Sequence, residues 1–252
     1  MIVTALTGLP EIHPGMDLDS MIAERARAVG IAGGDVLVVA HKVVSKAEGR
    51  MVRLVDVVPG PAARALAADT QKDPRLCEVI LGESRRILRR RGSTLICETH
   101  HGFVCANAGV DASNVPDGQL VLLPRDPDRS ARHLQARVAT VAGGRVGVVI
   151  SDTHGRPFRR GIVNVAIGVA GFRAVVDHRG RRDREGRMLI ATEQGLADEF
   201  AAAAGILMDK AGGLPAVVIR GVATEWAPGS VMDVLRDPAA DLFRGEGKEP
   251  DA

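Results

Sequence analysis

Three consecutive oxygen-bearing side chains, Ser151, Asp152 and Thr153, are the residues of this sequence best suited to chemistry. Asp and Thr oxygens are hard donors, which suit Mg²⁺ or Mn²⁺ better than Zn²⁺. Three arginines follow between positions 156 and 160, so a cation site and an anion site would be adjacent. The alternative is a turn closed by an Asx hydrogen bond, with a solvated basic loop behind it.

A short apolar run, Val146–Ile150, precedes these residues and would position them. The run is too short for a helix and rich in β-branched residues, so it predicts a buried strand. Gly155 and Pro157 predict a turn after it. We therefore expect Asp152 at the end of a strand, facing the crevice where α/β-type proteins tend to place ligands.

Two lysines, Lys42 and Lys46, lie four residues apart after a second predicted strand, Val36–Ala40. Cations beyond a strand end can hold phosphates. A solvated surface pair is the alternative interpretation, and the spacing alone does not separate the two.

A polar loop between positions 103 and 114 is the third candidate. Small residues and Gly109 allow the backbone to pass close to a ligand. Asn107, Asp111, Ser113 and Asn114 supply polar atoms along it. The loop is either a tight turn or a binding segment.

Two other polar clusters are weaker candidates. His100 and His101 lack the HExxH spacing, and no cysteine lies at zinc-site spacing, so a metal role is not expected. Asp73 and Pro74 predict a helix start, and the helix would continue to the arginines that precede Gly92. Arginines at a helix C-terminus complement its dipole, although an anionic substrate tail could also use them.

The composition narrows the class of protein. Of 252 residues 46% are hydrophobic, only 2% are aromatic, and the formal net charge is +2. Few aromatics and a balanced charge argue against nucleic-acid binding. Three cysteines without a CxxC pair predict no disulfide framework and a reducing cytoplasm. The N-terminus lacks the basic region of a signal peptide, and no apolar run is long enough to predict a membrane span.

Predicted strands and helices interleave irregularly along the chain. This order favours a mixed α/β fold of the α+β type over a doubly wound sheet. The GxGxxG and GxxxxGK[ST] motifs are absent, so neither a Rossmann nor a P-loop fold is expected. We expect one domain over residues 1–244 and a polar tail over 245–252. Further expected elements are strands at 2–7, 94–97, 120–123 and 216–219, and helices at 17–30, 129–141, 193–208 and 230–235.

Four motifs occurring in order identify a resemblance to a known family. They are Gly8-Leu9-Pro10, the segment 44–49 (VSKAEG), the segment 107–114 (NAGVDASN) and the segment 151–156 (SDTHGR). With them the chain resembles the coenzyme F420-0:L-glutamate ligases, from about residue 4 to residue 244. The resemblance implies an unusual mixed α/β fold, a homodimer, and GTP- and metal-dependent addition of L-glutamate to the lactyl-phosphate tail of a deazaflavin coenzyme.

The resemblance also implies roles for individual residues. It implies Mg²⁺ or Mn²⁺, as two ions, held by Asp111, Asp152 and Thr153, with Asp111, Asp152 and Lys46 as the catalytic residues. The implied nucleotide contacts are Leu9, Pro10, Glu11, Ile12, His41, Lys42, Lys46 and Asn114.

Two departures from the family pattern concern the same site. Archaeal members carry Ser-Thr where this chain has His41-Lys42, so the contact there must change character. They also carry a Glu ligand for the second metal after the alanine-rich helix, where this chain has Asp209. Either Asp209 substitutes for it, or the second ion rests on Thr153, phosphates and water.

The residues and the resemblance lead to one expected mechanism. Transfer of the γ-phosphoryl group of GTP to a carboxylate forms an acyl phosphate, which the glutamate amine attacks; such a transfer depends on positioning and charge neutralisation. One or more glutamates would be added, the first through an amide and later ones through γ-linkages. The alternatives are a metal-dependent phosphohydrolase, which would use water as the nucleophile, and a non-catalytic nucleotide-binding module.

Overall fold

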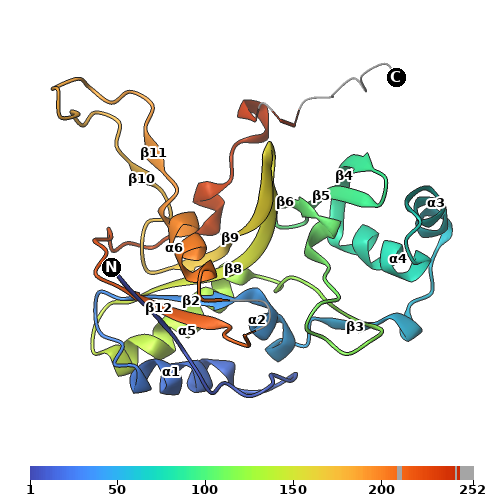
Figure 1. The fold of residues 1–252 in the computed structure, drawn as a ribbon, viewed down its shortest axis with the longest axis horizontal. Coiled ribbons are helices and arrows are strands. Elements are labelled where there is room, and N and C mark those ends of the chain that lie inside the picture. The colour runs from blue at the N-terminus through green and yellow to red at the C-terminus, as the bar shows by residue number, and fades with distance from the viewer. Residues whose placement is uncertain (209–211, 242, 245–252) are drawn as a thin grey trace.

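A mixed sheet is the frame of the molecule. The computed structural model describes residues 1–208, 212–241 and 243–244. Within these residues the main sheet contains, in spatial order, β1 (Ile2–Ala5), β12 (Ala216–Arg220), β2 (Val36–Ala40), β8 (Gly147–Arg156) and β9 (Arg159–Ala170) (Figure 1). Only β2 and β8 pair in parallel among these neighbours. The prediction of an α+β fold that is not doubly wound is therefore confirmed.

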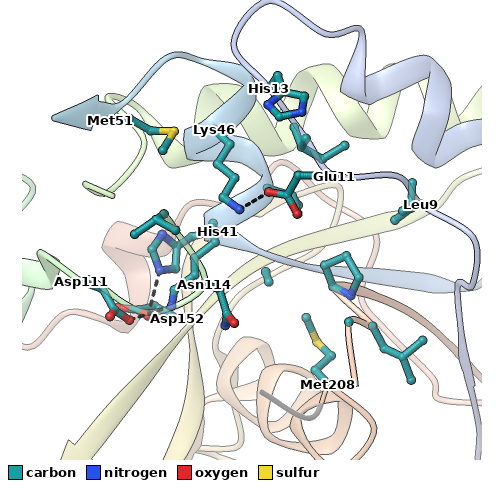
Figure 2. Close-up of a pocket in the computed structure, with 18 of the residues that line it drawn as sticks. Leu9, Glu11, His13, His41, Lys46, Met51, Asp111, Asn114, Asp152 and Met208 are labelled. Carbon is teal, nitrogen blue, oxygen red and sulfur yellow. Dashed lines mark hydrogen bonds and ion pairs between the residues drawn. The ribbon is translucent and has the colours of Figure 1, made fainter. Parts of the chain in front are cut away.

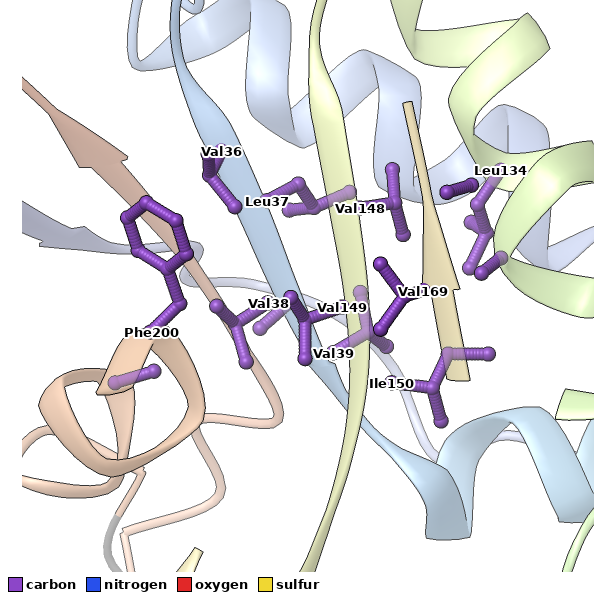
Figure 3. Close-up of a cluster of buried hydrophobic side chains, with 14 of the residues drawn as sticks. Val36, Leu37, Val38, Val39, Leu134, Val148, Val149, Ile150, Val169 and Phe200 are labelled. Atoms are coloured by element: carbon purple, nitrogen blue, oxygen red, sulfur yellow. The ribbon is translucent and has the colours of Figure 1, made fainter. Parts of the chain in front are cut away.

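Helices cover both faces of this sheet. Helices α1 (Leu18–Ala28) and α5 (Pro127–Ala142) pack together on one face, and α6 (Leu196–Gly205) packs on the other (Figure 1). Leu134 of α5 and Phe200 of α6 lie on opposite sides of strands β2 and β8 (Figure 3). Burial on both faces explains why β2 and the first part of β8, from Gly147 to Ile150, carry only apolar residues.

Acidic residues begin the two helices on the first face. Asp17 accepts a hydrogen bond from the Ser20 backbone N–H at the start of α1, and Asp126 accepts one from that of Arg129 at the start of α5. Each contact satisfies a donor that the first helical turn leaves unpaired. The expected positions of both helices are confirmed.

A second, smaller group of elements lies beside the main sheet (Figure 1). It has its own buried cluster, which includes Leu66, Ile80, Leu95 and Leu120. Its elements are α3 (Pro61–Thr70), α4 (Pro74–Glu83), the antiparallel sheet β4 (Ser84–Arg91), β5 (Thr94–Thr99) and β6 (Val104–Ala106), and the pair β3 (Met51–Arg53) and β7 (Gln119–Val121). We call this group the small lobe.

The arginine-rich segment is a strand rather than a helix end. The helix that Asp73 caps ends at Glu83, and the arginines lie on β4, which pairs with β5. The extended form lets Arg85 and Arg86 reach the buried carboxylate of Glu98, and β5 gains a partner for its backbone. These long-range contacts outweigh the local helical pattern, so the predicted helix over this segment is wrong.

Several short elements complete the fold. Helix α2 (His41–Ala47) follows β2 directly, and the alanine-rich helix starts three residues later than expected. The short helix expected over 230–235 is the single 3-10 turn η3. The remaining elements are the 3-10 turns η1 (Leu54–Asp56), η2 (Asn107–Gly109), η3 (Val231–Val234) and η4 (Pro238–Ala240), and the two-stranded arm β10 (Val176–Asp177) and β11 (Glu193–Gln194). The expected tail, 245–252, lies outside the described residues.

Candidate active site

A cavity of about 960 Å³ lies between the main sheet and the small lobe. Its wall is built by the segment 9–14, by helix α2, by the loop 111–119 and by strand β8. Figure 2 shows His41, Asp111 and Asp152 together on one side, and Leu9 and Met208 on the other. One end of the cavity is therefore charged and the other is apolar.

Asp152 lies in the middle of a long hairpin and not at a strand end. Strand β8 continues to Arg156, and its partner β9 pairs with every residue from Ser151 to Gly155. Pro157 and Phe158 make the turn, so the strand passes through the polar residues without ending. A register shift between Ile150 and Ser151 redirects the chain at this point, which is a common way to aim a side chain beside a functional site.

Two histidines flank the Asp152 carboxylate. The Nε2 atom of His41 lies 3.1 Å from Oδ1, and that of His154 lies 3.3 Å from Oδ2. Neither histidine contact has the alignment of a good hydrogen bond, whereas the Thr153 backbone N–H donates to Oδ1 at 2.6 Å. Burial alone would raise the pKa of Asp152, but the two imidazoles hold it well below its usual value.

The loop that carries Asp111 is held in an unusual backbone conformation. Asn107, Ala108 and Gly109 all have positive φ, of 51°, 54° and 73°. A Cβ atom on Gly109 would lie 2.6 Å from Cγ of Leu123, so glycine is required there by both shape and conformation. Beyond this turn the backbone of Asp111 pairs with Val121 of β7, which fixes the carboxylate in the cavity wall.

Asp111 is neutralised by a lysine from helix α2. The Nζ atom of Lys42 lies 2.7 Å from Oδ2 of Asp111. The backbone N–H of Ser113 donates to Oδ1 at 2.7 Å, and its hydroxyl donates to Oδ2 at 3.0 Å. Burial would raise the pKa of Asp111, and Lys42 together with Ser113 lowers it below the usual value.

The second lysine of α2 points to the opposite wall. The Nζ atom of Lys46 lies 2.5 Å from Oε1 of Glu11, with side chains that are 9% and 67% exposed (Figure 2). Lys46 is thus buried in the cavity wall, whereas its partner Glu11 is an exposed side chain at the rim of the cavity. The interpretation of both lysines as a solvated surface pair is wrong, because both line the cavity.

The remaining predicted residues complete the wall. Leu9, Pro10 and Ile12 form an apolar surface with Met208 and Leu214, and Asn114, at a φ of 58°, lines the cavity from the loop side. An apolar surface beside buried cations fits a nucleotide, whose base is flat and whose phosphates are charged. All of the residues predicted for nucleotide and metal within the described chain line this one cavity.

The oxygen donors of the cavity suit a hard cation only if water and the phosphates of a bound nucleotide complete its coordination shell. Asp111, Asp152 and Thr153 line the same cavity, and the Thr153 hydroxyl donates to Oδ1 of Asn164 at 3.0 Å. In the described part of the chain no three His, Cys, Asp or Glu side chains form a metal-binding group. Mg²⁺ usually takes one or two carboxylates and completes its shell with water and phosphates, so this donor set fits. Asp209 lies outside the described residues.

Sequence reasoning missed three of the neighbours of these groups. They are His154, Ser113 as a partner of both Asp111 and Lys42, and Asn164 on the facing strand. The alternation of a strand would have placed His154 on the same face as Asp152, because they are two residues apart. The cross-strand contact of Asn164 leaves no local signal in the sequence.

The other polar clusters do not line the cavity. His101 stacks on Phe103 and hydrogen-bonds the Pro124 carbonyl, and His100 contacts the Gly82 carbonyl. The contacts of these histidines stabilise the turn after β5 in the small lobe.

Within the described residues, no helix is long and apolar enough to span a membrane.

Comparison with known proteins identifies the family. The family model described as F420-0:Gamma-glutamyl ligase matches residues 8–221. Similar relatives, each named coenzyme F420:L-glutamate ligase, come from Methanopyrus kandleri (47% identical, covering 93% of this chain and 94% of that protein), Methanothermobacter thermautotrophicus (45%, 94% and 96%) and Archaeoglobus fulgidus (44%, 96% and 96%). The chain therefore belongs to the F420-0:gamma-glutamyl ligase family.

Proposed function

We propose that this protein joins L-glutamate to coenzyme F420-0, with GTP and a divalent cation, in the cavity between the main sheet and the small lobe. The observation that carries the proposal is the meeting of two acids and two lysines from separate segments in this cavity. The names of the relatives support the coenzyme and L-glutamate as substrates.

The proposed reaction has two steps. An oxygen of the F420-0 carboxylate attacks the γ-phosphorus of GTP, the bond to the β-phosphate oxygen breaks, and GDP leaves with that electron pair. The amine of glutamate then attacks the acyl carbon, phosphate leaves, and the amine loses a proton. The first step converts a poor leaving group into a good one, and it needs charge neutralisation on the phosphates.

The side chains of the cavity have distinct roles in this proposal. Asp111, Asp152 and Thr153 hold the cation, which would supply positive charge beside the transferred phosphoryl group. Lys46 would bind phosphate oxygens from the α2 side, where its ammonium group lies in the cavity wall beside the exposed Glu11. Leu9, Pro10 and Ile12 give the nucleotide base an apolar surface. Further glutamates would be added by the same two steps, each through a γ-linkage.

A homodimer is part of the proposal. The β8–β9 hairpin projects from the sheet and exposes Phe158 (91%) and Ile162 (58%). Exposed apolar side chains on a projecting element are typical of an interface. Light scattering during gel filtration should give twice the mass of the chain, and a monomer would contradict this part.

The test of function is a reconstituted reaction. The protein is incubated with F420-0, GTP, MnCl₂ and L-glutamate, and products are analysed by mass spectrometry. We expect glutamylated coenzyme and an equal amount of GDP, with neither formed when any one component is omitted. GDP released at the same rate without glutamate and coenzyme would instead indicate a phosphohydrolase. The absence of any nucleotide turnover would indicate a non-catalytic nucleotide-binding module.

A further inference from the structure

The ammonium group of Lys42 is fully occupied by the loop that carries Asp111. Its Nζ atom lies 2.7 Å from Oδ2 of Asp111, 3.1 Å from the Ser113 carbonyl oxygen and 2.5 Å from the Ser113 hydroxyl. A lysine has three N–H donors, and these are three acceptors. The contact joins residues 71 positions apart, so it depends on the packing of α2 against the small lobe.

The same contacts occupy the Asp111 oxygen that faces Lys42. Oδ2 accepts from both Lys42 and the Ser113 hydroxyl, while the Ser113 backbone N–H occupies Oδ1. The Lys42 side chain is 17% exposed and that of Asp111 is 35% exposed, so water screens the pair only in part. A cation that took this oxygen as a ligand would have to replace the ammonium group.

The second acid faces a basic side chain from the preceding residue of the same helix. His41 places its Nε2 atom 3.1 Å from Oδ1 of Asp152. The first two residues of α2 therefore each set one basic group against one of the two acids. Lys46, one turn later on the same helix, is paired with Glu11 and contacts neither acid.

We propose that Lys42 is an internal counter-ion, which occupies Asp111 in the nucleotide-free protein and moves to a nucleotide phosphate when a cation takes its place. This inference rests on the proposed function and adds a positioning role for one residue of the same cavity. The cation without nucleotide leaves the displaced ammonium with no anionic partner. The nucleotide provides that partner, so cation and nucleotide strengthen the binding of each other, and the coupling is reciprocal.

The test measures Mn²⁺ binding by calorimetry, with the full chain, in the absence of nucleotide and with a non-hydrolysable GTP analogue. Lys42→Met keeps the length of the side chain and removes its charge, and Lys42→Gln serves as a second variant if the first does not fold. Lys46→Met is the matched control, because it removes the same charge from the same cavity without touching Asp111. Lys42→Arg keeps the charge.

We expect Lys42→Met to bind Mn²⁺ about tenfold or more tightly than wild type without nucleotide, since a charge-assisted contact of this size no longer competes. Lys46→Met should change this affinity less than threefold, and Lys42→Arg should resemble wild type. The analogue should tighten Mn²⁺ binding strongly in wild type and much less in Lys42→Met.

Two results would overturn the proposal, and they differ in whether the proposed function survives. Equal or weaker Mn²⁺ binding by Lys42→Met and Lys42→Gln, beside a wild type that binds Mn²⁺, refutes the counter-ion role and leaves the proposed function intact. No Mn²⁺ binding by any protein, with or without the analogue, refutes the cation site of the proposed function and the counter-ion role with it.

Discussion

Asp152→Asn separates the charge of this side chain from its shape. The carboxamide has almost the same volume as the carboxylate, so the packing of β8 against β9 should survive. The negative charge beside His41 and His154 is lost. If Asp152 holds the cation, ligation should fall at least about 100-fold, since even the loss of a residue that only hydrogen-bonds a metal ligand costs about 10- to 100-fold.

The expected change in stability is modest. The backbone N–H of Thr153 now donates to a charged oxygen, and a charge-assisted hydrogen bond exceeds a neutral one by about 1 kcal/mol. Loss of the two imidazole contacts adds a similar amount, so Asp152→Asn should lower the free energy of unfolding by about 1–3 kcal/mol. For a chain of this length each kcal/mol lowers Tm by roughly 2–4 °C.

The pH dependence of stability gives a second measure of the same substitution. The pKa of Asp152 in the folded protein lies well below its usual value, which is about 3.9 in an unfolded chain. Below about pH 4 the unfolded state binds a proton that the folded state does not, so stability falls with falling pH. Above that value the stabilisation is complete. Asp152→Asn lacks this contribution, so its stability should fall less steeply in acid.

Three measurements decide the outcome. Circular dichroism checks that the variant is folded, denaturant unfolding at pH 7 and at about pH 3.5 measures its stability, and mass spectrometry measures ligation. A folded variant with full activity would refute the assignment of Asp152 to the cation. An unfolding free energy with the same acid dependence as wild type would refute the electrostatic account of its surroundings.

Three further predictions concern other parts of the molecule. Gly109→Ala should lower stability by about 2–4 kcal/mol, through overpacking against Leu123 and a left-handed backbone; a loss below 0.5 kcal/mol in urea unfolding would contradict this. Lys46→Ala should raise the KM for GTP and lower the turnover, together by about ten- to a hundredfold, because a buried charge contact contributes about 1.5–3 kcal/mol; steady-state kinetics within twofold of wild type would exclude a phosphate contact. Burial raises the pKa of the Cys105 thiol to about 12, so a thiol reagent at pH 8 should label Cys105 only after unfolding, and rapid labelling of native protein, detected by peptide mapping, would show that the site opens.

Local patterns predict four of the five strands of the main sheet, all but β9, and much of the site. The buried strand around Ile150, the helix that Asp126 begins and the candidate acids all follow from residue type and short spacing. The arginine segment does not, because its strand exists only through pairing with β5. Asp152 is likewise placed by cross-strand pairing with Val165, and no local pattern announces that its strand continues.

The partners of the charged groups are the least predictable part. Lys42 and Lys46 have the same residue type and lie on the same short helix, yet one pairs with Asp111 and the other with Glu11. The difference arises from which segment lies opposite each side chain. Contacts of this kind are set by tertiary packing over long separations, which sequence spacing does not encode.

The two buried clusters divide the site between separately packed parts of the chain. Asp152 lies two residues after Ile150, which belongs to the larger cluster, and Asp111 follows Val110, which belongs to the smaller one. A cluster with fewer apolar side chains opens at a lower free energy than the whole molecule. Catalysis should therefore disappear at denaturant concentrations where the amide protons of β2 and β8 are still protected from exchange. Substrates that contact both parts should reduce the difference between the denaturant concentration that abolishes catalysis and the one that unfolds β2 and β8. The reason is that ligand binding stabilises only the state in which the two parts are packed together.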